Sequence, residues 1–391
     1  MKFTANASVF SSALALVMRS INPRLPITAG RGVLIEASGG YVTLTGTDIQ
    51  TAARIRVAAM VRQPGRLLLG AHMLAEALRK PSGLEVSFAV EGKGMVAIAV
   101  GRSRYDIPQM DVDDFPPVGG APDDPILYVP GEYLHLAADH VAFAVATPEM
   151  GRPALLGMAL RFKPTHMQVI AGDSAVFAEL QVPYEGGRQP EPGTEISLLP
   201  PSVANVQRFF EPTDSVGVSV DKGWASFRAG DREYHAKTLT ELFPSVVDDV
   251  LNRARQQLCS WIEAERKPLI EALMRMDVVA SGEDIHPVRF AVRHAKELHL
   301  YSATRNGLAR DMVDVEGDGP DFTCGINAKQ MLALMDKVPG DKARIDLPGH
   351  PGQPIIITPA AVPEGSPPYT LLLAPLHPAS PTAASTMAGP Q

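Results

Sequence analysis

Apolar and polar positions follow the same order of patterns three times along the chain. Each third opens with a short strand-like run and then a helix-like run: "MKFTANASVFSSALALVMRS", "ILYVPGEYLHLAADHVAFAVA" and "SWIEAERKPLIEALMRMDVVA". Apolar residues recur at i, i+4 and i+7 in each helix-like run. The three trios are Val9, Ala13 and Leu16; Leu134, Ala138 and Val141; and Leu269, Leu273 and Met276. This spacing puts each trio on one helical face and predicts that the helix packs on a sheet.

Paired alternating runs follow each predicted helix. They are "GVLIEASGGYVTLTGTD", "ALLGMALRFKPTHMQVIAGD" and "HPVRFAVRHAKELHLYSAT", which turn at Gly-Gly, at Lys-Pro-Thr and around His294 to Lys296. Their alternation favours antiparallel strands with one buried face. A second helix is predicted next, in "AHMLAEALRK", "PSVANVQRFFE" and "NAKQMLALMDK", with Ser202 and Asn327 as N-caps of the last two. Further alternating strands, such as "LEVSFAV", "SVGVSV" and "ARIDL", close each third.

One closing phrase occurs twice. "RSRYDIPQMDVDDFPPV" and "DREYHAKTLTELFPSV" both place Arg shortly before Tyr and end on Phe-Pro, whereas the last third closes on "PPYTLLLAPL". The repeat predicts an α+β fold of three modules, residues 1–122, 123–254 and 255–376, with linkers at "VGGAPDDP" and "NRARQQLC". The remaining segment, 377–391, consists of small and polar residues that cannot bury a core, and we expect it to be a disordered tail.

Composition narrows the class of protein. A chain of 391 residues suggests two or three domains, and no apolar run approaches the length of a membrane span, so we expect no membrane association. Cys259 and Cys324 cannot form a disulfide framework, which fits a reducing cytoplasm. The net charge of -7 does not by itself indicate nucleic-acid binding, but a local positive surface is compatible with it.

Candidate catalytic and metal-ligating groups are weak. His72 and Glu76 share a helical face, but no third ligand accompanies them. His135 and His140 point about 140° apart around a helix, which prevents easy sharing of a metal. "GGRQPEPG" lacks the Gly-Lys-Ser/Thr continuation of a phosphate loop. We therefore expect no catalytic residue, no metal and no cofactor.

The order of these phrases resembles the bacterial sliding clamp family, the beta subunit of DNA polymerase III, over about residues 1–376. The resemblance rests on "MKFT", "VTLTGTDIQTAARIRV", "GRSRYDIPQMDVDDFP", "RPALLGMALRF", "FTCGINAKQMLALMDKV" and "YTLLLAPL". It implies the DNA clamp fold, in which each module has two helices packed on antiparallel sheets. Three modules form a crescent, and two crescents form a ring around duplex DNA. The ring would be a non-catalytic processivity factor in the cytoplasm, associated with the nucleoid.

The resemblance also implies partners and charged surfaces. The partners are double-stranded DNA, contacted without base readout, the polymerase III alpha subunit, the clamp loader and other proteins with a clamp-binding motif. A ring that slides calls for Lys and Arg on the helices to contact phosphates. The candidates are Arg19, Arg24, Arg79, Lys80, Arg152, Arg208, Arg275, Lys329 and Lys337. The family's Arg-Lys pair at the start of the second helix is replaced by Ala71-His72 and Pro201-Ser202. Each cation alone could equally belong to a solvated polar face.

In the family, a cleft between the second and third modules binds short peptides that carry a Gln and two hydrophobic anchors. Carried over to this chain, the cleft is formed by Leu155, Gly172, Ser174, Ala175, Val176, Phe177, Pro244, Val247, Leu371, Leu372, Leu373, Ala374 and Pro375. Asp173 keeps the family's acid, but Ala175-Val176 replaces a His-Arg pair, so the partner peptides are expected to differ. The other interpretation is that these residues only pack between modules.

Ring closure implies contact between the first and third modules of two protomers. Tyr105 and Ile107 match one side of this dimer interface, and Val278 and Val279 match the other.

Two further hypotheses for the function remain. One is a divergent clamp paralogue that docks partners with weak DNA loading. The other is a hydrolase on a repeated α+β scaffold, for which no catalytic constellation is present.

Overall fold

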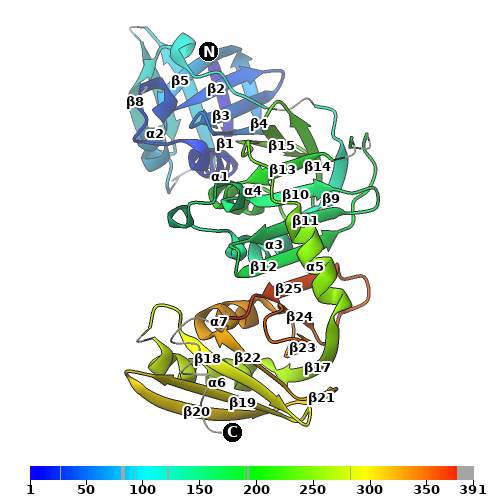
Figure 1. Cartoon of the computed structure of the whole chain (residues 1–391). Helices are drawn as coiled ribbons and strands as arrows, with labels where there is room; N and C mark the ends of the chain where they lie inside the picture. Colours follow the sequence, from blue (N-terminus) through cyan, green and yellow to red (C-terminus); the bar gives the residue numbers. More distant parts are fainter. Residues whose placement is uncertain are drawn as a thin grey trace. The chain divides into compact units, whose positions relative to one another are not determined.

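The computed structural model of the chain describes residues 1–26, 28–80, 84–92, 94–120, 123–188, 190–191, 193–281 and 283–376. The predicted tail, 377–391, and the predicted first boundary at 122 lie outside these residues. The chain folds into two compact units, one of residues 1–135 and 184–240, the other of 136–183 and 241–391. Residues of the predicted middle module contribute to both units, and the division into three modules stays a prediction (Figure 1).

The first unit is built on one antiparallel sheet of twelve strands within the described residues. The strand order is β1-β6-β7-β8-β5-β2-β3-β4-β16-β15-β14-β9. The bounds are β1 Lys2–Asn6, β2 Gly32–Ser38, β3 Tyr41–Thr47, β4 Thr51–Gln63, β5 Gly65–Gly70, β6 Glu85–Glu91, β7 Met95–Val100, β8 Ser103–Met110, β9 Leu127–Pro130, β14 Ser215–Asp221, β15 Trp224–Ala229 and β16 Arg232–Lys237. A short strand, β13 (Glu195–Leu198), also belongs to this unit.

Strand β4 connects the two halves of that sheet. Along one edge it pairs with β3, and its other edge is shared, because Ala59 to Gln63 pair with β1 whereas Thr51 to Ile55 pair with β16. The pairing of β1 with β4 closes the first eight strands of the order on themselves, which leaves the early strands few exposed edges.

Helices α1 (Ala7–Val17), α2 (Ala71–Ala77) and α4 (Pro200–Phe209) pack on this sheet. The Asn6 side chain caps α1 by accepting from the backbone N–H groups of Ser8 and Val9, each at 3.1 Å. The buried face of α1 consists of Ala7, Phe10, Ala13, Leu14 and Val17, so the predicted face through Val9 and Leu16 is wrong. The Phe10 ring packs at a tilt against the stacked rings of Phe3 on β1 and Phe88 on β6, and this aromatic contact orients the helix.

The second unit contains a sheet in the order β10-β11-β12-β25-β24-β23-β17-β21 and a four-stranded sheet in the order β20-β19-β18-β22. The bounds are β10 Met158–Phe162, β11 Met167–Gly172, β12 Val176–Val182, β17 Leu258–Glu265, β18 Pro287–Arg293, β19 Glu297–Thr304, β20 Gly307–Asp314, β21 Glu316–Asp318, β22 Phe322–Asn327, β23 Lys342–Pro348, β24 Ile355–Pro359 and β25 Tyr369–Leu373. The turn predicted around His294 to Lys296 joins β18 to β19, which confirms that prediction.

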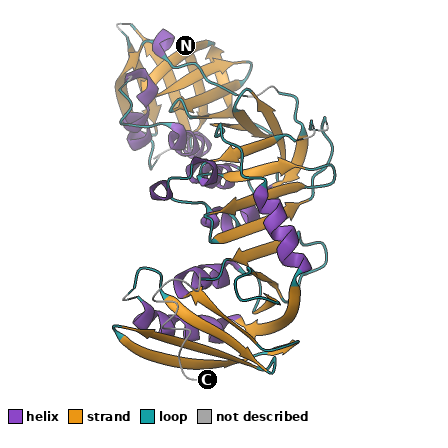
Figure 2. Ribbon diagram, viewed as in Figure 1, coloured by secondary structure: helices purple, strands orange, loops and turns teal. Residues whose placement is uncertain are grey.

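Helices α6 (Arg266–Ala280) and α7 (Ala328–Lys337) lie side by side against the four-stranded sheet (Figure 2). Leu269, Leu273 and Met276 are all buried on α6, as their spacing predicts. The Asn327 side chain caps α7 by accepting from the Gln330 N–H at 3.2 Å, which confirms that N-cap. The other predicted cap is wrong: Pro200 and Pro201 occupy the first turn of α4, and Ser202 is buried inside the helix.

Two further helices complete the described part of the chain. Helix α3 (Gly131–His140) buries Leu134 and ends before the buried Val141, whereas Ala138 is half-buried. Helix α5 (Val246–Gln256) includes most of "NRARQQLC", the run predicted as a linker. Short 3₁₀ turns lie at Met18–Ser20, Thr28–Arg31, Val112–Asp114, Ala142–Ala144, Pro148–Met150 and Pro153–Leu155.

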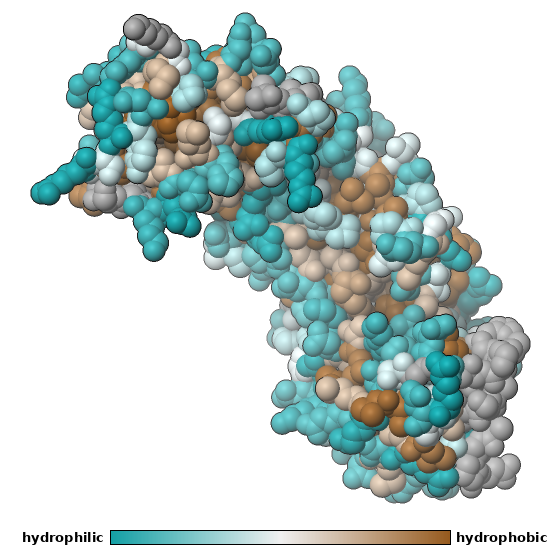
Figure 3. Space-filling model, turned by 90° about the vertical axis from the view of Figure 1, so that its left-hand side faces the viewer, coloured by the Kyte–Doolittle hydropathy of each residue, from teal (hydrophilic) through white to brown (hydrophobic). Residues whose placement is uncertain are grey.

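Buried apolar residues from helices and strands together confirm the α+β class. On the face drawn in Figure 3, patches of apolar residues lie among hydrophilic ones. No helix within the described residues is long and apolar enough to cross a membrane.

Candidate functional site

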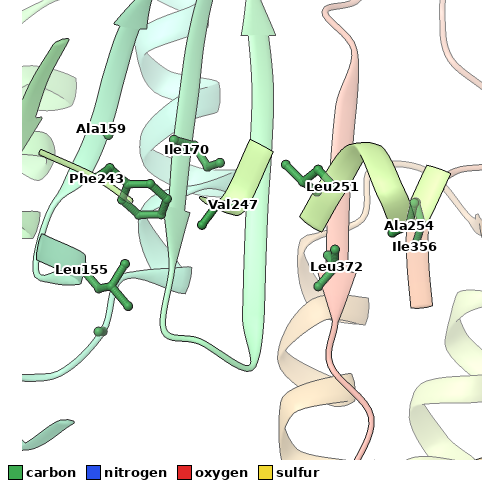
Figure 4. Packing of buried hydrophobic residues seen from close by; sticks show 10 residues of the cluster. Leu155, Ala159, Ile170, Phe243, Val247, Leu251, Ala254, Ile356 and Leu372 are labelled. Carbon is green, nitrogen blue, oxygen red and sulfur yellow. The ribbon is translucent and has the colours of Figure 1, made fainter. Parts of the chain in front are cut away.

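The residues predicted to form a peptide cleft come together in the second unit. Leu155, Val247 and Leu372 belong to one buried cluster (Figure 4). The half-buried Phe177 packs against this cluster. Phe243 fills the same cluster, and its ring meets Phe177 edge-on, with centroids 6.5 Å apart. Four segments that are distant in sequence therefore contribute to one apolar cluster.

Strand pairing divides the remaining cleft residues between two faces. Phe177 lies opposite Leu372 and Val176 opposite Leu373 in the antiparallel pair of β12 and β25. Because successive side chains on a strand point to opposite faces, Phe177 and Leu372 face the cluster whereas Val176, Leu371 and Leu373 are buried on the other side. The residues predicted to form one apolar wall are thus divided between the two faces of the same sheet.

The turn before β12 is held by Asp173. Its carboxylate accepts from the backbone N–H groups of Ala175 at 2.9 Å and Val176 at 2.8 Å, while Ser174 adopts a left-handed φ of 84°. Asp48 forms the same turn in the first unit: it accepts from Gln50 and Thr51, and Ile49 has a φ of 74°. The Ala374 N–H then donates to the Ala175 carbonyl at 2.7 Å, so the chain after β25 lines this turn. Pro375 follows and is half-buried.

Packing against Phe177 explains why a glycine occupies position 172 at the end of β11. A Cβ atom there would lie 2.1 Å from the Phe177 ring, which is closer than any real contact. Gly172 therefore permits the aromatic residue opposite it in the strand pair.

Sequence reasoning missed Arg161, which organises the Phe-Pro phrase. Arg161 is 7% exposed in β10; it donates to the Phe243 carbonyl at 2.8 Å and to both carboxylate oxygens of Asp248 at 3.0 Å. A cation within the otherwise apolar run "GMALRF" was the available signal, because a buried arginine requires partners. Pro244, next to Phe243, is half-buried beside this network.

Helix α5 was also missed. Val247, Leu251 and Ala254 recur at i, i+4 and i+7, and all three are buried in the cluster. The same spacing predicts the other helices, and in α5 charged residues surround the three apolar positions. The apolar stripe of α5 covers the cluster.

A polar pocket of about 430 Å³ opens beside α5, against the turn that precedes β11 and strands β11 and β12. Glu179, which is almost fully buried, accepts from Gln168 at 2.7 Å and pairs with Arg255 at 2.7 Å. This hollow is lined mainly by polar side chains, so it differs in character from the apolar cluster on which α5 rests.

The predicted DNA-contacting cations lie on helices, turns and loops. Arg19, Arg24, Arg79, Lys80, Arg152, Arg208, Arg275 and Lys329 are exposed, and Lys337 is half-buried. Three of them have acidic neighbours: Arg79 lies 3.6 Å from Glu76, Lys337 3.5 Å from Asp336, and Arg275 2.5 Å from Asp311. These acids reduce the positive potential that such side chains present to phosphates.

The predicted dimer residues lie on one edge strand and one helix end. Tyr105 on β8 is exposed and Ile107 is buried; Val278 near the end of α6 is 74% exposed, and Val279 is half-buried. Among the described residues, β8 pairs with β7 from Ser103 to Pro108, whereas on its other side only Gln109 and Met110 pair with β5. Most of that strand edge is open to another chain.

Of the histidines and cysteines that sequence analysis weighed, His72 and Cys259 are exposed, whereas His135 and His140 contact backbone carbonyls and Cys324 is buried. His135 contacts the Phe210 carbonyl and His140 the Lys337 carbonyl, each at 2.7 Å. Burial raises the pKa of the Cys324 thiol to about 12, so it carries no thiolate at neutral pH. Within the described residues, no group of three or more His, Cys, Asp or Glu side chains is placed to hold a metal ion.

Solved structures define the class of fold. The beta subunit of Streptococcus pyogenes DNA polymerase matches with a TM-score of 0.87 at 18% identity, and it covers 96% of this chain and 100% of its own. The DNA polymerase sliding clamp of Bacillus subtilis matches with a TM-score of 0.85 at 19% identity, covering 96% and 99%. The fold is therefore the DNA clamp fold.

Sequence comparison finds similar proteins along most of the chain. Residues 1–119 match the family model described as the DNA polymerase III beta subunit, N-terminal domain. The beta sliding clamp of Caulobacter vibrioides is 24% identical over 364 residues, covering 91% of this chain and 95% of that protein. The beta sliding clamp of Micrococcus luteus is 31% identical over 116 residues, 30% of this chain. The first 119 residues thus match the DNA polymerase III beta subunit family, and the chain is similar to beta sliding clamps over nearly its whole length.

Proposed function

We propose that this protein is a DNA polymerase processivity factor, a sliding clamp that encircles duplex DNA and tethers the replicative polymerase. One observation carries the proposal: likeness to beta sliding clamps extends over nearly the whole length of both chains, 91% and 95% for the Caulobacter vibrioides protein. A tether of this kind carries out no bond chemistry. Its grip depends on topology, so weak phosphate contacts are sufficient for retention.

The proposed assembly is a homodimer of three-module protomers in the cytoplasm, at the nucleoid. The open edge of β8 and the exposed Val278 support it, because an unpaired strand edge and an exposed apolar side chain gain from being covered. The proposed partners are double-stranded DNA, the polymerase III alpha subunit, a clamp loader and other proteins with clamp-binding motifs.

The proposed peptide site is the surface of the cluster around Phe177 and Leu372. Support comes from the four segments that converge there and from the partial exposure of Phe177, Pro244 and Ala374. Burying two apolar anchors of a peptide would contribute roughly 1.5–3 kcal/mol each. Ala175 supplies no charge at the rim and Val176 is buried on the other face of the sheet, so the preferred peptides would rely on apolar anchors.

Loading on circular DNA tests the proposal. The full chain is loaded on nicked circular duplex by a clamp loader, and the DNA is then cut at one site. We expect the protein to remain on the uncut circle and to dissociate from the linear product, because a ring slides off a free end. The uncut circle is the matched control.

A second candidate is an adaptor that docks partners and loads poorly on DNA. It is favoured by the first turns of α2 and α4, which begin Ala71-His72 and Pro200-Pro201 and contain no Lys or Arg. Retention that is the same on circular and linear DNA, or no loading at all, would support the adaptor and refute the tether.

A further inference from the structure

A row of cationic and aromatic side chains crosses the four-stranded sheet of the second unit. Arg289 on β18 lies opposite Tyr301 on β19, and Tyr301 lies opposite Arg310 on β20. Residues opposite one another on paired strands point to the same face. The neighbours Val288, Phe290 and Leu300 are buried, which puts the row on the face away from α6.

These side chains line a pocket of about 330 Å³. Its walls include Arg289, Arg293, Arg310, His299 and Tyr301. The volume lies at the lower end of the roughly 300–1,000 Å³ typical of small-molecule sites. The hollow therefore suits one compact group more than an extended chain.

Positive charge dominates this pocket. Asp311 is its only acidic lining residue within the described part of the chain, and the Asp311 carboxylate pairs with Arg275 of α6. Arg293 lies 3.8 Å from Asp321, and His299 contacts Glu297 at 2.8 Å. Arg310 has no ion pair with any described residue, and its guanidinium lies 5.5 Å from the centroid of the Tyr301 ring. A guanidinium that stacks on an aromatic ring keeps its in-plane N–H groups available to an acceptor.

We propose that this pocket binds a compact oxyanion, a phosphate group. Guanidinium groups donate in pairs to phosphate oxygens, and a Tyr hydroxyl can supply a further donor. Acidic side chains limit the size of the ligand: Glu297 lies opposite both Arg293 and Asp314, which places carboxylates at one border of the pocket. These carboxylates repel an extended polyanion, so the ligand is an isolated phosphate on a small molecule or a modified side chain.

Titration calorimetry of the full chain with inorganic phosphate, at constant ionic strength in chloride buffer, tests this site. We expect saturable binding that Arg310→Gln weakens about tenfold, because one charge-assisted hydrogen-bond pair is lost. The matched control is Arg305→Gln, which removes the same charge from the exposed turn between β19 and β20 and should leave the affinity unchanged. Arg310 is exposed, so its replacement should not unfold the sheet.

Parallel titrations with ADP and with a phosphoserine peptide identify the source of the phosphate. Tighter binding of either one, lost in Arg310→Gln, supports the site and names its ligand. The absence of saturable binding by all three probes would overturn the proposal, as would equal affinities for Arg310→Gln and wild type. A short DNA duplex that depends on Arg310 while the three probes do not bind would assign the row to nucleic acid and also refute a compact site.

Discussion

Arg161 contacts Phe243 in two ways: its guanidinium donates to the Phe243 carbonyl at 2.8 Å and lies 5.5 Å from the centroid of the Phe243 ring. The same guanidinium binds Asp248 near the start of α5. At the second Phe-Pro phrase of the sequence, one buried cation thus links strand β10, the turn at Phe243 and helix α5.

Replacing Arg161 tests that role. Arg161→Met removes the partner of Asp248 and of the Phe243 carbonyl, and we expect a loss of about 2 kcal/mol in the free energy of unfolding, less than for a fully buried pair because Asp248 retains water contact. Urea denaturation measures the change. The control, Arg253→Met, affects an exposed arginine whose bond lies within α5, and it should change stability by much less. Equal effects would contradict the role of Arg161.

Gly172 and Phe177 are predicted to depend on each other. Gly172→Ala puts a methyl group into the Phe177 ring, and we expect a destabilisation of about 1–3 kcal/mol. In a Phe177→Leu background the same change should cost clearly less, because the ring is gone. Thermal unfolding of the four proteins in this double-mutant cycle checks the prediction. An additive result would show that the methyl group is accommodated elsewhere.

A pH dependence is predicted for Glu233 in the first unit. A hydrogen bond from His235, together with the charge of Arg54, holds the pKa of Glu233 below its ordinary value of 4.5 despite partial burial. A lowered folded-state pKa stabilises the protein above the unfolded value, and this contribution is lost as the pH falls through the folded value. We expect Glu233→Gln to cost about 1 kcal/mol at pH 7.

That cost should disappear as the pH falls from 4.5 through the lower pKa of the folded state. Unfolding free energies of wild type and Glu233→Gln across this range provide the measurement, and Glu85→Gln, at an exposed position, is the control. A cost that is constant with pH would mean that Glu233 acts through packing rather than charge.

Peptide docking is predicted to be sensitive at Pro244. Leu372 is unsuitable for a test because it is only 1% exposed, so a charge there would damage the core itself. Pro244→Asp instead places a charge at a half-buried position of the cluster surface, and we expect at least about a tenfold loss of affinity for a peptide with two apolar anchors. Fluorescence anisotropy measures it, with the exposed Val362→Asp as control. Unchanged affinity would place the peptide elsewhere.

Assembly is predicted to depend on Val278. Val278→Asp would force a carboxylate into the proposed interface and should raise the dimer dissociation constant by more than about tenfold. Sedimentation velocity at micromolar concentration compares it with Met60→Asp, a similar change at a 65% exposed position of β4. A wild-type chain that sediments as a monomer would refute the ring.

Much of the secondary structure could be predicted from pattern because long, regular alternation allows few interpretations. The turn from β18 to β19 and the buried face of α6 are examples. The face of α1 could not be predicted: "ASVFSSALALV" is apolar on several sides, and the choice is made by Phe3 and Phe88 from distant strands. Ser202 failed as a cap because two prolines before it are better first-turn residues.

The candidate site was only partly predictable. Resemblance located the segments around Phe177 and Leu372, and the structure brings them into contact. It could not assign Val176 and Leu371 to the opposite face, because that depends on the register of β12 against β25. Arg161 and Asp248 lie far apart in sequence, and only the fold reveals that one neutralises the other.

The shared edge of β4 has a consequence for synthesis on the ribosome. Arg54 and its partner Glu233 on β16 are separated by 179 residues. At a synthesis rate of about 5–20 residues per second, β16 is therefore made roughly 10 to 40 s after the first half of β4. During that interval Thr51 to Ile55 present a bare strand edge at the tunnel exit, where a nascent chain on the next ribosome can pair with it. Thr51 to Ile55 are therefore a site of aggregation risk during synthesis, until β16 has been made.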